Sequence, residues 1–261
     1  MANERTIDVD LLAGRTVLRL RLNQPKGNVL TSAMMEEMAA ALRAHRDEQH
    51  LRLVVFCGAG GNFSFGASVE EHTRERVAAM LRTFHRFVLD VAEYPVPTAA
   101  LVEGRCLGGA FELALCCTLV FATPTARFAC PEIKLGVFPP VFAAVGARRL
   151  PGALAERLLL TGEEIDAAAA ERCGLAVLLD GAAAPEAALL EWHAAHFAPL
   201  SAFALRQAVA ASRRGSGVID ALGESLPAIE SQYLREVVPS HDGNEGIDAF
   251  LARRAPAWED A

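Results

Sequence analysis

The chain has 261 residues, of which 52% are hydrophobic and 22% are charged, a composition that suits a folded protein and excludes a disordered one. Its formal net charge of −7 argues against nucleic acid or a membrane surface as a partner, because such anionic partners attract a cationic excess. The six cysteines have no CxxC spacing, so we expect free thiols and a reducing, cytoplasmic location.

The first hundred residues alternate between strand patterns and helix patterns. Short alternating or β-branched runs predict strands, whereas an apolar period near 3.6 residues predicts helices. Residues 1–16 have no apolar stretch of the kind that a signal peptide needs. The elements that follow are a strand at 16–22, a helix that Ser32 can cap, a strand at 51–57, a helix at 77–91 and a strand at 98–103. The last three form a βαβ unit.

The most apolar stretch, residues 99–122, is predicted to be buried core. Glu103, Arg105 and Glu112 interrupt it, and charges inside a bilayer are costly, so a membrane span is not favoured.

Beyond this stretch, short strands are predicted at 118–123 and 176–179. From about residue 186 the pattern is helical, with a break at 215–217. We therefore predict an α/β core over residues 1–195 and a helical region over residues 196–261.

A glycine-rich loop, residues 58–68, lies between a predicted strand and a predicted helix. Such a loop can leave backbone N–H groups free to face an anion, although a plain turn is an equally good interpretation of the loop alone. The loop lacks the final glycine of a dinucleotide-binding fingerprint. Ser64 does not lie in a GxSxG motif, so a serine hydrolase is not favoured.

Two glutamates lie in apolar surroundings. Glu112 follows the paired glycines Gly108 and Gly109, which open a predicted helix and let the backbone approach a ligand closely. Glu132 follows Pro131. Because burial raises a carboxyl pKa towards the range of a useful general acid, the two glutamates are a candidate acid–base pair. Each could instead be a structural glutamate that is hydrogen-bonded to the backbone.

Five segments together resemble the crotonase superfamily, also called the enoyl-CoA hydratase/isomerase family, and they span nearly the whole chain. They are residues 23–30 (NQPKGNVL), 63–69 (FSFGASV), 107–113 (LGGAFEL), 128–136 (FACPEIKLG) and 245–251 (EGIDAFL). The resemblance implies an α/β fold in which ββα units form a spiral, followed by a C-terminal helical trimerisation region. It also implies a homotrimer or a dimer of trimers.

The resemblance further implies how the site works. The backbone N–H groups of Ala67 and Gly109 would form an oxyanion hole for the enolate of a thioester. Glu112 and Glu132 would both be catalytic, as in the hydratases of the family. The implied reaction is addition of water to a conjugated acyl-CoA, with the coenzyme A portion belonging to the substrate and with no separate cofactor and no metal.

Four residues would hold the coenzyme A portion by the same resemblance. Phe65 would meet the adenine, and Lys26 would lie near the phosphates. Phe250 and Arg253 match positions that pack on the adenine end from a neighbouring subunit. Lys26 and Arg253 could equally be solvated surface charges.

The chain departs from the family pattern at three places. Ser68 replaces an aspartate, and Ala110 replaces a third glycine. The third departure is Pro140, at a position where ordinary enoyl-CoA hydratases have a glycine whose N–H binds the catalytic water, and proline has no N–H.

The segment around Pro140 also bears on the substrate. Phe138, Val141 and Phe142 are expected to line the acyl pocket. Residues 136–143 and 63–72 are similar to hydratases of cyclic dienoyl-CoA thioesters such as cyclohexa-1,5-diene-1-carbonyl-CoA, so a cyclic or dienoyl substrate is favoured over a straight-chain one.

Other functions stay open from the sequence. A crotonase-fold isomerase or acyl-CoA hydrolase would share most of these motifs, and a non-catalytic CoA-binding paralogue would share the fold. A metal site is not favoured, because His193 and His196 lack a third ligand nearby and are interpreted as surface histidines. The sequence leaves His72 and His85 undecided between the acyl pocket and a helix surface.

Overall fold

The computed structural model of the chain describes residues 5–179 and 184–261. Residues 1–4, which begin the N-terminal segment that was predicted not to be a signal peptide, lie outside the described residues. The strands are β1 (Ile7–Leu12), β2 (Val17–Leu22), β3 (Leu53–Gly58), β4 (Thr98–Val102), β5 (Arg105–Leu107), β6 (Leu119–Ala122), β7 (Arg127–Ala129), β8 (Glu164–Asp166) and β9 (Val177–Leu178). The helices are α1 (Ser32–Ala44), α2 (Val77–Ala92), α3 (Gly109–Cys116), α4 (Pro140–Arg149), α5 (Gly152–Thr161), α6 (Ala167–Arg172), α7 (Pro185–His196), α8 (Ala202–Ser216), α9 (Val218–Asp220), α10 (Leu226–Gln232) and α11 (His241–Leu251). Short 3₁₀ turns form η1 (Val69–Glu71) and η2 (Pro131–Leu135), and π-helical turns form η3 (Ala221–Ser225) and η4 (Tyr233–Val237).

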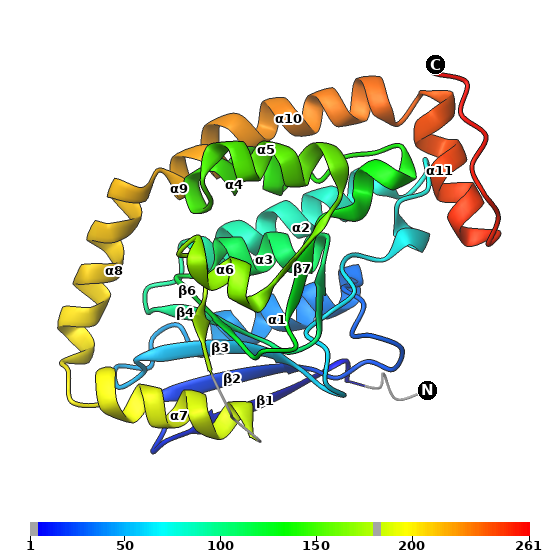
Figure 1. Cartoon of the computed structure of the whole chain (residues 1–261). Helices are drawn as coiled ribbons and strands as arrows, with labels where there is room; N and C mark the ends of the chain where they lie inside the picture. Colours follow the sequence, from blue (N-terminus) through cyan, green and yellow to red (C-terminus); the bar gives the residue numbers. More distant parts are fainter. Residues whose placement is uncertain (1–4, 180–183) are drawn as a thin grey trace.

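Two sheets organise the α/β part of the chain (Figure 1). The larger has the order β1-β2-β3-β4-β6-β9, in which only β1 pairs antiparallel with its neighbour. The smaller has the order β5-β7-β8. Two successive units follow the same course. In the first, β4 joins the large sheet and β5 joins the small sheet before α3 begins. In the second, β6 joins the large sheet and β7 joins the small sheet before η2 and α4 begin. This repeat is the predicted spiral of ββα units.

In the middle of the large sheet, strand β3 is buried on both faces. Along β3, Val54 and Phe56 belong to the main apolar cluster, while Leu53, Val55 and Cys57 belong to a second one. This separation follows from the two-residue period of a strand. The second cluster includes side chains of α7, so α7 covers the face of the sheet that lies opposite the main core.

The predicted elements largely agree with the observed ones. The βαβ unit is present as β3, α2 and β4, with the two strands parallel and adjacent. The expected cap at Ser32 is wrong, because the side chain of Thr31 accepts the hydrogen bond from the Met34 N–H instead. The expected break at 215–217 is confirmed, since α8 ends at Gly217 in the left-handed conformation. Residues 99–122 form β4, β5, α3 and β6 in the core, as predicted.

The C-terminal part is helical from α7 onwards, and the last strand ends at Leu178. The exact division at residue 195 stays a prediction. Helix α10 lies over α4, and α11 packs on η2 (Figure 1). Within the described residues, every helix is too short or too polar to cross a membrane.

Candidate active site

The site forms where three parallel backbone segments end together. Ser64 makes an isolated parallel bridge with Cys106 of β5, and Cys106 pairs with Phe128 of β7. Loops that follow the carboxyl ends of adjacent parallel strands share one edge of a sheet, which is where α/β proteins commonly bind ligands. The residues that follow these ends include Ala67, Gly109 and Glu132.

Ala67 and Gly109 present two unused backbone donors. Gly109 is the first residue of α3, and a Cβ built on it would lie 3.3 Å from the nitrogen of Ala67. Within residues 5–179 and 184–261, neither N–H donates a backbone hydrogen bond. The two N–H groups therefore lie side by side, next to the positive end of a helix, where a developing negative charge on oxygen would be stabilised.

The close approach of these two segments depends on Gly66. Its φ is +95°, and a Cβ at this position would lie 2.5 Å from the carbonyl oxygen of Leu107. A side chain there would push the loop away from β5, so glycine is required for the geometry.

Glu112 is buried on α3, only 3% exposed, and faces the start of α4. The Phe142 N–H donates a hydrogen bond of 2.8 Å to its Oε1. Burial raises the pKa of Glu112, while hydrogen bonds from the backbone of Phe142 and Val141 act in the opposite direction. Its carboxylate thus has donors at a helix N-terminus that favour the ionised form.

Glu132 has a different environment. Burial raises its pKa, and the negative charge of Glu112 raises it further. Its Oε2 is buried and has no hydrogen-bond partner among the described residues. A Cβ on Gly108 would lie 2.4 Å from its Oε1, so the glycine leaves the space that this carboxyl group occupies. The surroundings of Glu132 favour the protonated, neutral form.

The two carboxyl groups face one inner cavity. Its lining includes both glutamates together with Ala67 and Gly109. The remaining walls are largely apolar and consist of Met80, Leu81, Phe84, Phe138, Pro139 and Pro140, with His72 and Tyr233 as polar members. Two carboxyl groups with raised pKa values and two free N–H donors around one largely apolar space can perform acid–base chemistry next to a carbonyl.

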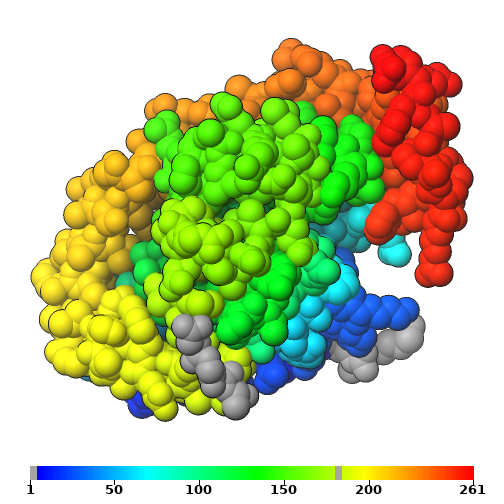
Figure 2. Space-filling model, in the orientation of Figure 1, coloured from blue at the N-terminus to red at the C-terminus, as the bar shows by residue number. Residues whose placement is uncertain are grey.

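An outer cavity of about 300 Å³ adjoins the inner one and shares Ala67, His72 and Glu132 with it. Phe65, Gly108 and Phe250 also line it. Figure 2 shows an indentation between the red C-terminal segment and the cyan and blue part of the chain, on the side where these residues lie. The outer cavity therefore connects the glutamates to the molecular surface.

The structure separates the predicted coenzyme A contacts into two groups. Phe65 and Phe250 both line the outer cavity of their own chain. Lys26 and Arg253 are exposed and line neither cavity. Lys26 is nevertheless close to the rim, because a Cβ on the adjacent Gly27 would lie 2.7 Å from the ring of Phe65.

Two predicted pocket residues are elsewhere. Val141 and Phe142 were expected to line the acyl pocket, but neither is among the residues that line the inner or the outer cavity, and both side chains are buried. Phe142 packs against Phe111 with ring centroids 5.6 Å apart. Because α4 begins at Pro140, the helix turns these side chains inwards and leaves backbone N–H groups to face Glu112.

Tyr233 is the site residue that the sequence did not identify, whereas His72, which the sequence left undecided, lines both cavities. His72 Nδ1 lies 2.7 Å from the carbonyl oxygen of Ser68, which can only accept, so this nitrogen carries the proton. Burial lowers the pKa of His72, which favours the neutral ring. Tyr233 comes from a segment distant in sequence and has no motif around it that could have revealed it.

Two further histidines, His85 and His193, are buried. His85 lies between α2 and α10, where its Nδ1 is 2.5 Å from Oε2 of Glu230. His193 is only 1% exposed, so its interpretation as a surface residue is wrong.

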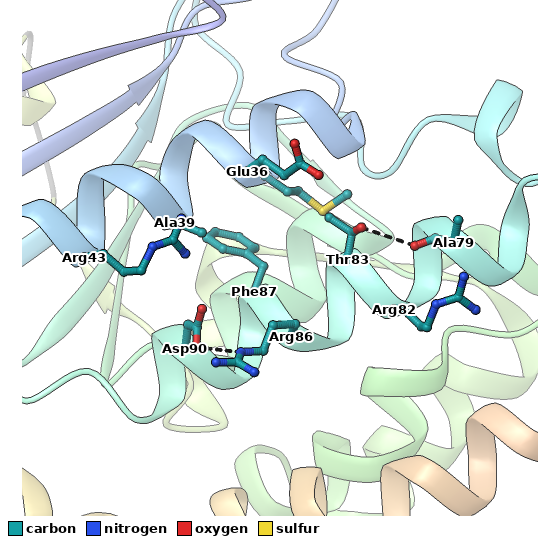
Figure 3. Close-up of a pocket in the computed structure, with 10 residues that line it drawn as sticks. Glu36, Ala39, Arg43, Ala79, Arg82, Thr83, Arg86, Phe87 and Asp90 are labelled. Atoms are coloured by element: carbon teal, nitrogen blue, oxygen red, sulfur yellow. Dashed lines mark hydrogen bonds and ion pairs between the residues drawn. The ribbon is translucent and has the colours of Figure 1, made fainter.

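A larger cavity of about 490 Å³ lies away from the glutamates, between α1 and α2. Figure 3 shows its side chains, with Arg86 paired to Asp90 and the Thr83 hydroxyl bonded to the Ala79 carbonyl. It shares no lining residue with the two cavities above. Neither Glu112 nor Glu132 lines this larger cavity.

Comparison with known proteins gives consistent results. The sequence model of a family described as enoyl-CoA hydratase/isomerase matches residues 13–261. The cyclohexa-1,5-dienecarbonyl-CoA hydratase of Thauera aromatica is 43% identical over 244 residues, which cover 94% of this chain and 93% of that protein. The 2,3-dehydroadipyl-CoA hydratase of Escherichia coli is 33% identical over 251 residues, covering 93% of this chain and 95% of that protein.

Solved structures agree in fold. An enoyl-CoA hydratase/isomerase from Xanthobacter autotrophicus matches with a TM-score of 0.83 and 27% identity over 95% of this chain and 97% of that one. An enoyl-CoA hydratase from Mycobacterium avium subsp. paratuberculosis matches with a TM-score of 0.82 and 26% identity over 98% of this chain and 99% of that one. The expected fold class, a ββα spiral with a C-terminal helical region, is confirmed.

Proposed function

The chain belongs to the enoyl-CoA hydratase/isomerase family, and we propose that it adds water to a conjugated double bond of an acyl-CoA thioester, with a cyclic dienoyl group as the preferred substrate. The observation that carries this proposal is the pair of buried carboxyl groups, Glu112 and Glu132, which face one cavity beside two free backbone N–H groups. Hydration needs both an acid and a base at the same double bond, and the pair supplies them.

The environments of the two glutamates support a different proposed role for each. Glu112, with backbone donors on its carboxylate, takes a proton from water as the water oxygen bonds to the electrophilic carbon. Glu132, kept neutral by burial, gives its proton to the carbon next to the thioester carbonyl. The N–H groups of Ala67 and Gly109 stabilise the enolate oxygen between these events, a contribution of about 2.7–4 kcal/mol per donor.

The cyclic substrate is supported by sequence identity and is compatible with the apolar lining of the inner cavity. The relative named for cyclohexa-1,5-dienecarbonyl-CoA is 43% identical, whereas the hydratase named for 2,3-dehydroadipyl-CoA is 33% identical. Pro139, Pro140 and the contacting rings of Phe138 and Tyr233 line the cavity beside the glutamates.

The coenzyme A portion is proposed to leave the inner cavity along the outer one. Gly108 lets the thioester pass close to the backbone, and Phe65 and Phe250 give apolar contacts for the outer portion. Lys26 and Arg253, both exposed, are proposed to meet the phosphates. The reaction as proposed uses no further cofactor and no metal.

The proposed assembly is a homotrimer or a dimer of trimers. Leu200 lies just before α8 and is 47% exposed, and Phe203 lies in the first turn of α8 and is 72% exposed. Such exposure is expected of apolar side chains that a partner subunit covers. The proposed location is the cytoplasm, which suits six free thiols, five of them buried.

The test is a mass-spectrometric assay of the purified protein with cyclohexa-1,5-diene-1-carbonyl-CoA and crotonyl-CoA in parallel. We expect the cyclic substrate to gain the mass of one water at the higher kcat/KM. A faster reaction of crotonyl-CoA would contradict the cyclic preference. Release of free coenzyme A, or rearrangement without a mass change, would replace hydration by hydrolysis or isomerisation.

Glutamine variants test the acid–base pair. Glu112→Gln and Glu132→Gln should each lower kcat by about 10²–10⁴-fold, because each removes a proton acceptor or donor while keeping the side-chain shape. Glu48→Gln, which alters a glutamate paired with Arg15, is the control and should leave kcat unchanged. Wild-type kcat in both active-site variants would disprove the mechanism.

A further inference from the structure

The inner cavity has few groups that can donate a hydrogen bond to a reacting water. Pro139 and Pro140 form its wall at the start of α4, and neither has an N–H. The N–H of Phe142, further into the helix, is used by Glu112. The unused N–H groups of Ala67 and Gly109 are side by side, in the arrangement that suits a carbonyl oxygen. A water molecule needs another donor to orient its oxygen.

Tyr233 supplies a hydroxyl group in this cavity. The residue is 2% exposed and lines the cavity together with both glutamates. Burial raises the pKa of Tyr233, and the negative charges of Glu132 and Glu112 raise it further, so the hydroxyl keeps its proton. An O–H donor therefore remains available inside the cavity.

The position of the Tyr233 ring is fixed by its neighbours. Phe138 packs edge-on against it, with ring centroids 5.2 Å apart and an interplanar angle of 77°. One helical turn earlier, Glu230 bonds to the buried His85 of α2. This contact ties α10 to α2, and Tyr233 begins the π-helical turn that follows α10. The ring is held from two sides, as a positioning residue must be.

We propose that the Tyr233 hydroxyl donates a hydrogen bond to the reacting water and orients it for attack, in place of the backbone N–H that Pro140 lacks. The water donates one hydrogen to the Glu112 carboxylate and accepts from Tyr233, which leaves its other lone pair to form the new C–O bond. The water proton goes to Glu112, the Glu132 proton goes to carbon, and the tyrosine proton stays on its oxygen. This inference rests on the proposed hydration.

The chain offers a matched pair of variants, because it has only two tyrosines. Tyr233→Phe removes the hydroxyl in the cavity. Tyr94→Phe removes the hydroxyl of a tyrosine that is equally buried but bonds to the Leu42 carbonyl in the core, at 3.1 Å. The measurements are kcat, KM, the pH profile of kcat and the melting temperature of each full-length protein. The same assay records whether the wild-type protein adds water to the acyl-CoA substrate.

We expect Tyr233→Phe to lower kcat by about 10- to 100-fold, the range of a hydrogen bond to a charged or developing charged group, with KM little changed. The apparent pKa values of the kcat profile should stay in place. Tyr94→Phe should lower the melting temperature and keep kcat. In the Tyr94→Phe protein, 3-fluorotyrosine incorporated at position 233 keeps both ring and O–H and should restore the kcat that phenylalanine loses.

Three results would overturn the inference about Tyr233. They are a wild-type kcat in Tyr233→Phe, a loss of kcat that 3-fluorotyrosine does not prevent, and a shifted pH profile at an unchanged maximal rate. The last would mean that the hydroxyl bonds to a glutamate rather than to water. These results leave the proposed function standing if the wild type adds water, whereas a wild type that adds none removes both.

Discussion

At the scale of the residue, the site depends on how much each glutamate is stabilised as an anion. Glu112 accepts backbone hydrogen bonds at the start of α4, whereas Oε2 of Glu132 has no partner among the described residues. Two nearby buried carboxyl groups resist being ionised together. The proposed division into a base and an acid rests on this asymmetry.

The raised pKa of Glu112 predicts a pH-dependent stability. At pH values between the ordinary pKa of a glutamate and the raised pKa of Glu112, the unfolded chain has released the Glu112 proton while the folded chain keeps it. The free energy of unfolding therefore falls as pH rises through this interval to the raised pKa. Glu112→Gln removes this titration and relieves Glu132 of a negative neighbour. The gain in melting temperature over wild type should therefore be larger at about pH 8 than at about pH 5. Equal differences at both pH values would contradict the raised pKa.

Gly108 is predicted to fix the position of the Glu132 carboxyl group. An alanine Cβ would lie 2.4 Å from Oε1, so Gly108→Ala should displace the carboxyl group and lower kcat by about 10²-fold. Gly60→Ala is the matched control, because Gly60 also has a positive φ, +73° against +51°, but has no atom near its Cβ position. Both variants introduce backbone strain, but only Gly108→Ala should displace the Glu132 carboxyl group. Steady-state kinetics of the two variants therefore separate these effects. Equal kcat in the two would rule out the contact.

At the scale of the element, α11 completes the outer cavity through close packing. Ile247 and Phe250 of α11 line the cavity, and a Cβ on Gly246 would lie 2.1 Å from the Leu135 carbonyl oxygen of η2. The same turn, η2, contains Glu132. Helix α11 and the acid are therefore held by one contact between two backbones.

This contact predicts the effect of a methyl group at position 246. Gly246→Ala should lower the free energy of unfolding by about 1–3 kcal/mol and raise KM for the thioester, because α11 must move off η2. Gly223→Ala, at a helical glycine with open space around its Cβ position, should instead stabilise by about 0.5–1 kcal/mol. Denaturant unfolding and KM measurements test both. A Gly246→Ala protein as stable as wild type would show that the packing is looser.

At the scale of the whole molecule, α8 forms an outer edge on the side away from α11 (Figures 1 and 2). Phe203 on this helix is 72% exposed, an unfavourable place for an aromatic ring unless another subunit covers it.

The proposed trimer predicts a solution mass of three or six times the 27.9 kDa chain. Light scattering after gel filtration measures it. Phe203→Ser should shift the mass towards the monomer, because it removes apolar surface from the proposed interface. Arg214→Ser, on the same helix, is the control and should leave the mass unchanged. A monomeric wild type would disprove the proposed assembly.

The sequence by itself determined the main strands, the long helices and both glutamates. Apolar periods over six or more residues predict β2, β3 and α2, because burial of one or two faces requires those periods. The strands β5, β7 and β8 have three residues each, too few for a period to appear. The family motifs located Ala67, Gly109, Glu112 and Glu132, whose proximity in the fold agrees with the roles that the resemblance implies.

Only the tertiary structure decided which groups share the cavity and what charge each favours. The parallel pairing of β5 with β7 brings Gly108 and Glu132 together, and the start of α4 supplies the donors to Glu112. The direction of Val141 and Phe142 depends on where α4 begins. Tyr233 reaches the glutamates from about a hundred residues further along the chain because α10 packs over α4. Burial and long-range packing set these properties, and neither is encoded in the local pattern of residues.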